Sequence, residues 1–237
     1  MDVDELKNKA CREHTQPFED AFIRLVLRRI SIRITKYFVR TRVTPNQITV
    51  LGFLVGVLAA FCFALGEYTY LVVGAILIQL SFIFDLVDGE VARVESMQSL
   101  AGAWLDPVLD MIRTGLLFLG MAFGLWTQTN NVFVWPLSYL GFFGFAIEGF
   151  SSSKQSEIYG KIYISRVRKV SNSGLLQKFY LNLYGLGSIM LLLFISAIFN
   201  QLVVFLILFS VTSNLDWATK LVWYHHKNKK YKGNIEN

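Results

Sequence analysis

The sequence predicts an all-α, polytopic membrane protein, in which six transmembrane helices follow an amphipathic helix at the membrane interface. Of the 237 residues, 54% are hydrophobic, and the mean hydropathy is +0.44. The apolar residues form runs of about 20, the length that a helix needs to cross the hydrocarbon core of a bilayer. A soluble domain of this size spreads its apolar residues over shorter, alternating runs. The length allows one membrane domain and no large soluble domain.

The N-terminal part divides into a polar tail, residues 1–15, and an amphipathic segment, residues 16–42. Apolar residues recur in the second segment at spacings of three and four: Phe22, Leu25, Val26, Ile30, Ile34 and Phe38. Lys and Arg fill most of the other positions. This pattern is typical of a basic helix that lies in the membrane interface. A helix packed on a partner domain is the alternative interpretation.

The transmembrane spans begin after Thr44-Pro45-Asn46, because proline disfavours helical backbone in the residue before it. The predicted spans are residues 46–66, 70–92, 102–126, 131–151, 174–199 and 201–223. Together they form a catalytic transmembrane domain at 43–225. Residues 226–237 form a basic tail that we expect in the cytoplasm.

The positive charges predict the orientation of these spans. Of the 23 Lys and Arg residues, ten lie in residues 1–45, six in 151–178 and five in 220–232. The alternate loops, near residues 67–69, 127–130 and 200, carry none. Positive residues favour the cytoplasmic side, so both termini and the basic loops are predicted to be cytoplasmic. The net charge of +6 then indicates contact with anionic lipid headgroups, and we expect no nucleic-acid partner.

Four carboxylates lie within the predicted membrane region, at the cytoplasmic ends of the second and third spans. Asp85 and Asp88 are three residues apart, and Asp106 and Asp110 are four apart, so each pair shares one helix face. The two spans are consecutive and antiparallel, which allows the pairs to meet. A charged group at this depth costs about 2.5–3.5 kcal/mol on insertion scales. Carboxylate oxygens suit hard cations, so the sequence predicts one or two Mg²⁺ or Mn²⁺ ions held by these residues.

Membrane carboxylates also mark ion pathways, so a cation or proton transporter is an alternative function. Small residues beside the aspartates, such as Gly89 and Gly102, instead favour close approach of a helix or a nucleotide. Arg93 adds a planar donor group for phosphate.

The spacing of these residues carries a resemblance to a known family. It reads Asp85-x2-Asp88-Gly89-x2-Ala92-Arg93-x8-Gly102-x3-Asp106-x3-Asp110. This pattern resembles the signature of the CDP-alcohol phosphotransferases, also called CDP-alcohol phosphatidyltransferases. The stretch Thr44-Pro45-Asn46-Gln47-Ile48-Thr49 is similar to the family's entry to its first span.

The resemblance implies metal-dependent transfer of a phosphoalcohol group from a CDP-linked lipid or other alcohol to a polar alcohol acceptor, with release of CMP. It also implies six transmembrane helices, a homodimer and an active site facing the cytoplasm. Asp110 would act as the general base and, with Asp85, Asp88 and Asp106, as a metal ligand. The CDP site would comprise Asp85, Gly89, Ala92, Arg93 and Gly102. A catalytically silent membrane scaffold is a further alternative.

The acceptor is predicted less directly than the donor. Arg113 lies one helical turn from Asp110, and a basic loop after the fourth span carries Lys154, Lys161 and Arg166. These residues are interpreted either as an anion site for a phosphorylated acceptor such as inositol phosphate or as lipid-contacting flanks. The stretch at residues 28–49 looks most like family members that handle inositol phosphate, including those that use CDP-inositol as the donor.

Two further carboxylates lie in later spans, Glu148 in the fourth and Asp216 in the sixth. They are interpreted either as residues that support the site or as hydrogen-bond partners between helices.

Overall fold

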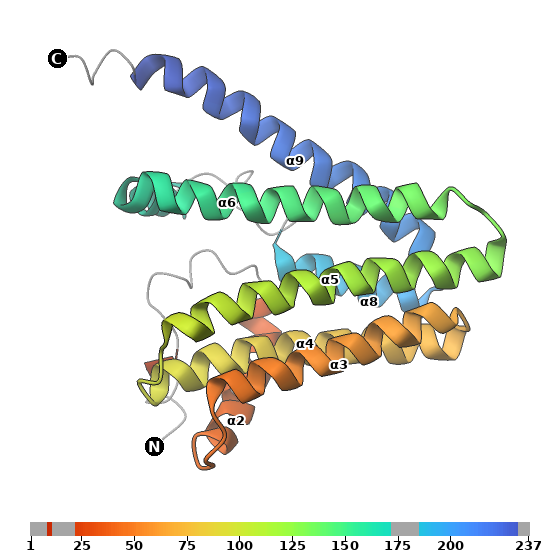
Figure 1. Cartoon of the computed structure of the whole chain (residues 1–237), viewed down its shortest axis with the longest axis horizontal. Coiled ribbons are helices and arrows are strands. Elements are labelled where there is room, and N and C mark those ends of the chain that lie inside the picture. The colour runs from red at the N-terminus through yellow and green to blue at the C-terminus, as the bar shows by residue number, and fades with distance from the viewer. Residues whose placement is uncertain (1–8, 11–21, 172–184, 232–237) are drawn as a thin grey trace.

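The computed structural model describes residues 9–10, 22–171 and 185–231, and leaves out the side chains of 155–156, 158–171 and 223–231. The regular structure of the described residues is entirely helical, which confirms the predicted all-α class. In Figure 1 the long helices α3, α4, α5 and α6 run along the longest axis, and α9 is inclined to them.

The amphipathic segment forms a π-helical turn, η2 (Ile23–Leu27), that continues into α2 (Arg28–Phe38). The helix therefore ends before residue 42, the predicted limit, and residues 11–21 lie outside the described part. Helix α2 packs on α4.

The buried face of η2 and α2 overlaps the predicted apolar stripe only in part. Its most buried members are Ile23 and Leu27 of η2 and Ser31, Ile32 and Thr35 of α2. Leu25, Val26 and Ile30 are exposed. Phe22, Ile34 and Phe38 of the predicted stripe are partly buried against the core. The apolar periodicity did not show Ser31 and Thr35, because these are hydroxyl residues whose polar partner, Glu90, lies on α4.

The first three spans form one packed group. Helix α3 (Pro45–Leu65) begins in a capping box between Thr44 and Gln47. Helices α4 (Tyr68–Val94) and α5 (Leu100–Thr129) follow, and both pack on α3. Their bounds lie within three residues of the predicted spans.

Glycines bring α5 unusually close to α3. A Cβ atom on Gly120 would lie 2.2 Å from the carbonyl oxygen of Ala60, and one on Gly124 would lie 2.0 Å from that of Phe63. Each position therefore excludes any larger residue unless the backbone moves. Close helix contacts of this kind are typical of membrane proteins, where small residues let backbones approach.

The second group comprises α6 (Val134–Ser171), α8 (Leu186–Ile198) and α9 (Leu202–Tyr231). Helix α6 packs on α5 and α9, and α8 packs on α4 and α9. A buried core that includes Phe63, Ile78, Met121, Leu193 and Phe209 joins both groups.

The segment after residue 151 differs from the prediction of a loop, because α6 continues as a helix to Ser171. Its polar residues do not break a helix, since the segment contains no proline and charged side chains can stay solvated on helix surfaces. Residues 172–184, where the fifth span was predicted to begin, lie outside the described part.

Within the described part of the chain, four helical stretches are long and apolar enough to cross a membrane: α3, α4, α5 and residues 202–222 of α9. Helix α8 is apolar but has only 13 described residues. The count of six spans stays a prediction.

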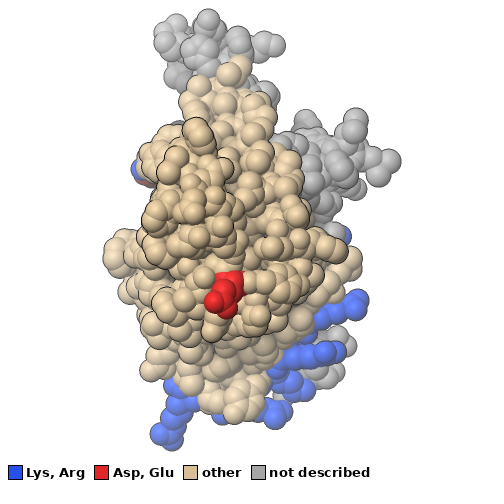
Figure 2. Space-filling model, turned by 90° about the vertical axis from the view of Figure 1, so that its right-hand side faces the viewer, with Lys and Arg blue, Asp and Glu red and all other residues tan. Residues whose placement is uncertain are grey.

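Figure 2 views the molecule from the end that carries the α3–α4 and α5–α6 connections. Charged side chains are scarce on this face, with one small acidic spot and Lys and Arg residues at its lower edge.

Candidate metal centre and adjoining cavity

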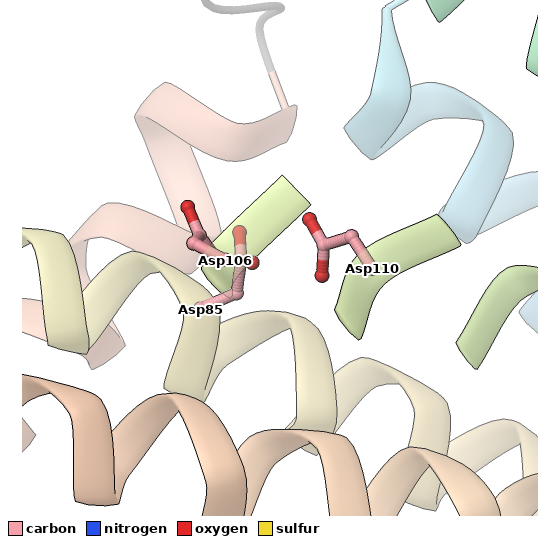
Figure 3. A group of neighbouring side chains, drawn as sticks. All are labelled: Asp85, Asp106 and Asp110. Carbon is pink, nitrogen blue, oxygen red and sulfur yellow. The ribbon is translucent and has the colours of Figure 1, made fainter. Parts of the chain in front are cut away.

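Three of the four predicted aspartates converge where α4 meets α5. Asp85 comes from α4, and Asp106 and Asp110 come from α5 (Figure 3). Each offers a carboxylate oxygen, and the three oxygens lie within 4.8 Å of one another. We refer to Asp85, Asp106 and Asp110 as the three-aspartate group.

The turn between α4 and α5 produces this convergence. Only residues 95–99 separate the two helices, and Ser96 takes a positive φ of 56° within the turn. Ser99 then caps α5, because its hydroxyl oxygen accepts a hydrogen bond from the Gly102 amide. The C-terminal turns of α4 and the N-terminal turns of α5 consequently lie at the same end of α3, on which both helices pack.

Among the described ion pairs, a single cation, Arg113, contacts the three-aspartate group, so its charge is balanced only in part. Asp106 has a buried oxygen, Oδ1, that no described donor reaches. Asp110 forms an ion pair with Arg113, in which Nη2 lies 2.7 Å from Oδ1. A buried carboxylate oxygen without a hydrogen-bond donor is costly, so the group fits a bound cation.

Asp88, the fourth predicted ligand, is not part of the three-aspartate group. Its Oδ2 accepts a hydrogen bond of 2.5 Å from the Thr49 hydroxyl of α3. The Asp88 side chain is buried and lines the cavity beside the group.

This cavity has a volume of about 320 Å³ and lies between the start of α3, the end of α4 and the start of α5. Four of the five residues predicted to bind CDP line it, namely Gly89, Ala92, Arg93 and Gly102. Asp85, the fifth, lies in the three-aspartate group instead. Asp106 lines the cavity and also belongs to that group, so the two features adjoin.

Two glycines line the cavity at positions where a side chain would press on a neighbouring residue. A Cβ atom on Gly102 would lie 2.9 Å from Asn46 Oδ1, and one on Gly89 would lie 3.0 Å from Arg93 Nη1. Arg93 also donates a hydrogen bond from Nε to the carbonyl oxygen of Ala10. Its guanidinium group is thereby oriented at the cavity wall.

The predicted acceptor residues are not brought together by the described side chains. Arg113 is buried beside Asp110, whereas Lys154 is half exposed and pairs with Glu157 on the same helix. Lys161 and Arg166 lie on the last part of α6, where their side chains fall outside the described part.

Two partners of the site were missed by sequence reasoning. Thr49 lies in the quoted Thr-Pro-Asn-Gln-Ile-Thr stretch, but nothing in that pattern shows which residue it meets. Glu90 follows Gly89 and is fully buried. Its carboxylate contacts Arg28, Ser31 and Thr35 of α2 at 2.5, 2.7 and 2.6 Å. A further carboxylate at membrane depth was the available signal for Glu90.

Glu148 and Asp216 lie apart from the three-aspartate group and share one cation. Lys220 Nζ lies 2.5 Å from Glu148 Oε1 and 2.7 Å from Asp216 Oδ2. The contact joins α6 to α9. This geometry favours the predicted role as a link between helices.

Comparison with known proteins places most of the chain in one family. The family model described as CDP-alcohol phosphatidyltransferase matches residues 42–209. The chain is 41% identical over 110 residues to the bifunctional IPC transferase and DIPP synthase of Aquifex aeolicus. That match covers 46% of this chain and 24% of the relative. The chain thus spans about a quarter of the length of this relative and of the protein of the same name from Thermococcus kodakarensis.

A longer alignment relates the chain to the archaetidylinositol phosphate synthase of Pyrococcus horikoshii. It shows 24% identity over 187 residues and covers 79% of this chain and 85% of the relative. Among solved structures, the phosphatidylinositol phosphate synthase of Mycobacterium tuberculosis with CDP-DAG bound has a TM-score of 0.63 at 20% identity. That match covers 81% of this chain and 92% of the other, and it shows a shared fold. The same enzyme in complex with manganese and citrate gives a TM-score of 0.53.

Proposed function

Because the chain belongs to the CDP-alcohol phosphatidyltransferase family, we propose that it transfers a phosphoalcohol group from a CDP-linked donor to an alcohol and releases CMP. The observation that carries the proposal is the three-aspartate group beside a cavity lined by the residues of the family motif. A half-buried cluster of carboxylates next to a cavity lined by Arg93 and two glycines suits a diphosphate held through cations. A transporter or a silent scaffold has no comparable use for the cavity.

Asp85, Asp106 and Asp110 would hold the divalent cation, with Asp88 close enough to the same cavity to assist. The ligand set consists of oxygens, which suits Mg²⁺ or Mn²⁺, and the unpartnered Asp106 Oδ1 supports the fit. When bound, the cations would neutralise the donor diphosphate and make CMP a better leaving group. We propose two ions, as the family resemblance implies, and the manganese complex of the mycobacterial relative supports a divalent metal.

The cavity would take the cytidine diphosphate part of the donor. Gly89 and Gly102 allow close approach to the backbone, and the Arg93 guanidinium offers planar donors to phosphate oxygens. The donor's alcohol part is proposed to be a lipid, which the CDP-DAG complex of the mycobacterial relative supports. CDP-inositol is the second candidate, because relatives of this chain are named as DIPP synthases.

Asp110 is proposed as the general base. The acceptor hydroxyl oxygen forms a bond to the phosphorus that carries the donor's alcohol, and the bond from that phosphorus to the CMP oxygen breaks. The hydroxyl proton passes to the Asp110 carboxylate, which lies at the edge of the three-aspartate group and is one-third exposed. Positioning and charge neutralisation supply most of the rate gain in such transfers.

We propose a polar alcohol acceptor, with inositol phosphate as the first candidate. The names of the relatives, which include inositol phosphate synthases of archaetidyl and phosphatidyl type, support this choice. Lys154, Lys161 and Arg166 on the later part of α6 remain proposed acceptor contacts. The active site is proposed to face the cytoplasm together with both termini, and the homodimer remains a proposal.

The decisive experiment measures CMP release by purified protein in liposomes with Mg²⁺. CDP-diacylglycerol and CDP-inositol serve as donors in separate arms, with inositol phosphate, glycerol phosphate and serine as acceptors. We expect metal-dependent CMP release, and Asp110→Asn should lower it by at least about a hundredfold while CDP-donor binding stays within about threefold. Wild-type protein that binds metal but releases no CMP from any donor would overturn the proposal and favour a scaffold.

A further inference from the structure

Arg113 is buried in the membrane domain although its guanidinium group is always charged. Its exposed fraction is 6%, and its closest acidic partner is Asp110, one turn earlier on α5. Nη2 of Arg113 lies 2.7 Å from Asp110 Oδ1. Burying a charged arginine costs desolvation free energy, which its contacts in the folded protein have to offset.

Two other helices hold this arginine in a single orientation. Arg113 Nη1 donates a hydrogen bond of 3.0 Å to the Ser81 hydroxyl of α4. The Ser81 hydroxyl in turn donates to the carbonyl oxygen of Gly52 on α3, at 2.7 Å. Since that bond uses the only hydroxyl hydrogen, a lone pair of the Ser81 oxygen is left facing Arg113.

Helix α3 also leaves room for the aliphatic part of the Arg113 side chain. A Cβ atom on Gly56 would lie 2.4 Å from Arg113 Cδ and 2.6 Å from Cγ. An alanine at Gly56 would therefore displace the side chain. Three helices thus contribute to one position of the guanidinium group.

We propose that Arg113 is a positioning residue for Asp110 and not a ligand of the acceptor, an inference that rests on the proposed function. The ion pair fixes Oδ1, so the Asp110 carboxylate keeps one rotamer and presents Oδ2 to the neighbouring site. The guanidinium charge also offsets part of the repulsion within the three-aspartate group. To reach an acceptor, the Arg113 side chain would have to break its contacts with Asp110 and Ser81 and move away from Gly56.

The kinetic test compares Arg113→Gln and Ser81→Ala with a matched control, Ser138→Ala. Ser138 is equally buried and donates to the Phe118 carbonyl oxygen at 2.6 Å, but no described arginine contacts it. Arg113→Gln should lower kcat by at least about tenfold, Ser81→Ala by about threefold, and Ser138→Ala by less than twofold. The acceptor KM should change by less than threefold in each. A raised acceptor KM with unchanged kcat would overturn the proposal, as would unchanged kcat in both site variants.

A second measurement does not depend on activity. The unfolding midpoint in detergent, without metal or substrate, is measured for Asp110→Asn, Arg113→Gln and the double variant. Arg113→Gln alone should lower Tm by at least about 3 °C, because three carboxylates lose their cation. Adding Asp110→Asn should restore part of this loss, which makes the two effects non-additive. Additive shifts would show that the two residues are not coupled.

The two measurements separate this inference from the proposed function. If wild-type protein releases no CMP but the changes in unfolding midpoint are non-additive, the proposed function is wrong and the coupling of Arg113 to Asp110 stands. If the enzyme is active but these changes are additive, the proposed function stands and the coupling is wrong. If Arg113→Gln does not fold, Ser81→Ala carries the kinetic test, since it keeps the charge and loses only the hydroxyl that orients it.

Discussion

Thr49 is the α3 residue whose side chain bonds an aspartate of the motif. Its hydroxyl donates to Asp88 Oδ2, and hydrogen bonds to charged groups contribute about 1.5–3 kcal/mol. We expect Thr49→Val to lower kcat/KM for CMP release by about tenfold or more, and Thr49→Ser to retain most of it. Thr129→Val is the control, because the Thr129 hydroxyl lies at the far end of α5 and its described partners are backbone atoms: it donates to the Leu125 carbonyl oxygen and accepts from the Asn131 amide. Equal activity of Thr49→Val and wild type would mean that Asp88 needs no fixed orientation.

Gly102 tests whether the cavity is the donor site. A methyl group there would press on Asn46 Oδ1 at 2.9 Å and Ser99 Oγ at 3.1 Å, which narrows the cavity. We expect Gly102→Ala to raise the KM for the CDP donor by about tenfold with little loss of stability, because alanine favours a helix over glycine.

The matched control is Gly115→Ala on the same helix. Its Cβ atom would meet only ring carbons of Phe142, at an ordinary 3.4 Å. It gains the same helix propensity and lies outside the cavity, so its donor KM should stay at the wild-type value. If both variants gave the wild-type donor KM, the donor would have to bind elsewhere.

At the level of single residues, the sequence predicted the aspartates better than their partners. Charges at membrane depth and their spacing are visible along the chain, so Asp85, Asp106 and Asp110 could be expected to meet. The contact of Thr49 with Asp88 depends on how α3 rotates against α4, which spacing within one segment does not show. Arg113 was expected to bind the acceptor because it lies one turn from Asp110. In the structure, the same spacing instead allows an ion pair between Arg113 and Asp110.

Among the elements, α2 is joined to α4 by a buried polar contact. Fully buried Glu90 accepts from Arg28, Ser31 and Thr35, and a buried charge pair that loses one partner costs about 3–5 kcal/mol. We expect Glu90→Gln, which keeps the volume, to destabilise the protein by about 2–4 kcal/mol, measured as a lower unfolding midpoint in detergent.

Glu157→Gln provides the comparison for that change. Its pair with Lys154 is exposed on α6, and exposed pairs contribute little. The unfolding midpoint of Glu157→Gln should therefore remain near that of the wild type. Similar midpoints for Glu90→Gln and Glu157→Gln would show that α2 is held by its apolar contacts alone.

The elements themselves were predictable where apolar length decides the structure. Helices α3, α4 and α5 match their predicted spans because runs of that length have few alternatives in a membrane. The extension of α6 to Ser171 was missed because polar composition shows that a segment lies outside the membrane but does not show whether it is a helix or a loop. The contacts of Gly120 and Gly124 with α3 were missed because a glycine pattern does not identify its partner helix.

For the whole molecule, the described charges support one orientation in the membrane. The chain is an integral membrane protein, and the end shown in Figure 2 is nearly free of charge. Positive residues favour the cytoplasmic side, so the α4–α5 turn should lie in the cytoplasm and the α5–α6 turn outside it.

Single cysteines test this orientation after Cys11 and Cys62 are replaced by serine. Glu95→Cys lies in the exposed α4–α5 turn and Asn131→Cys in the exposed α5–α6 turn. In sealed right-side-out vesicles, a membrane-impermeant maleimide should label Asn131→Cys and leave Glu95→Cys unlabelled until the membrane is opened. The reverse pattern would invert the topology and put the three-aspartate group on the outer side.

The position of the cavity along the chain has a consequence for biogenesis. Every residue that lines it lies between Pro45 and Asp106, and the three-aspartate group is complete at Asp110. A chain leaves the ribosome from its N-terminus. The four aspartates and every residue that lines the cavity are therefore made before α6, α8 and α9. If the α4–α5 turn faces the cytoplasm, as proposed, these carboxylates can meet free magnesium before the later helices are in place.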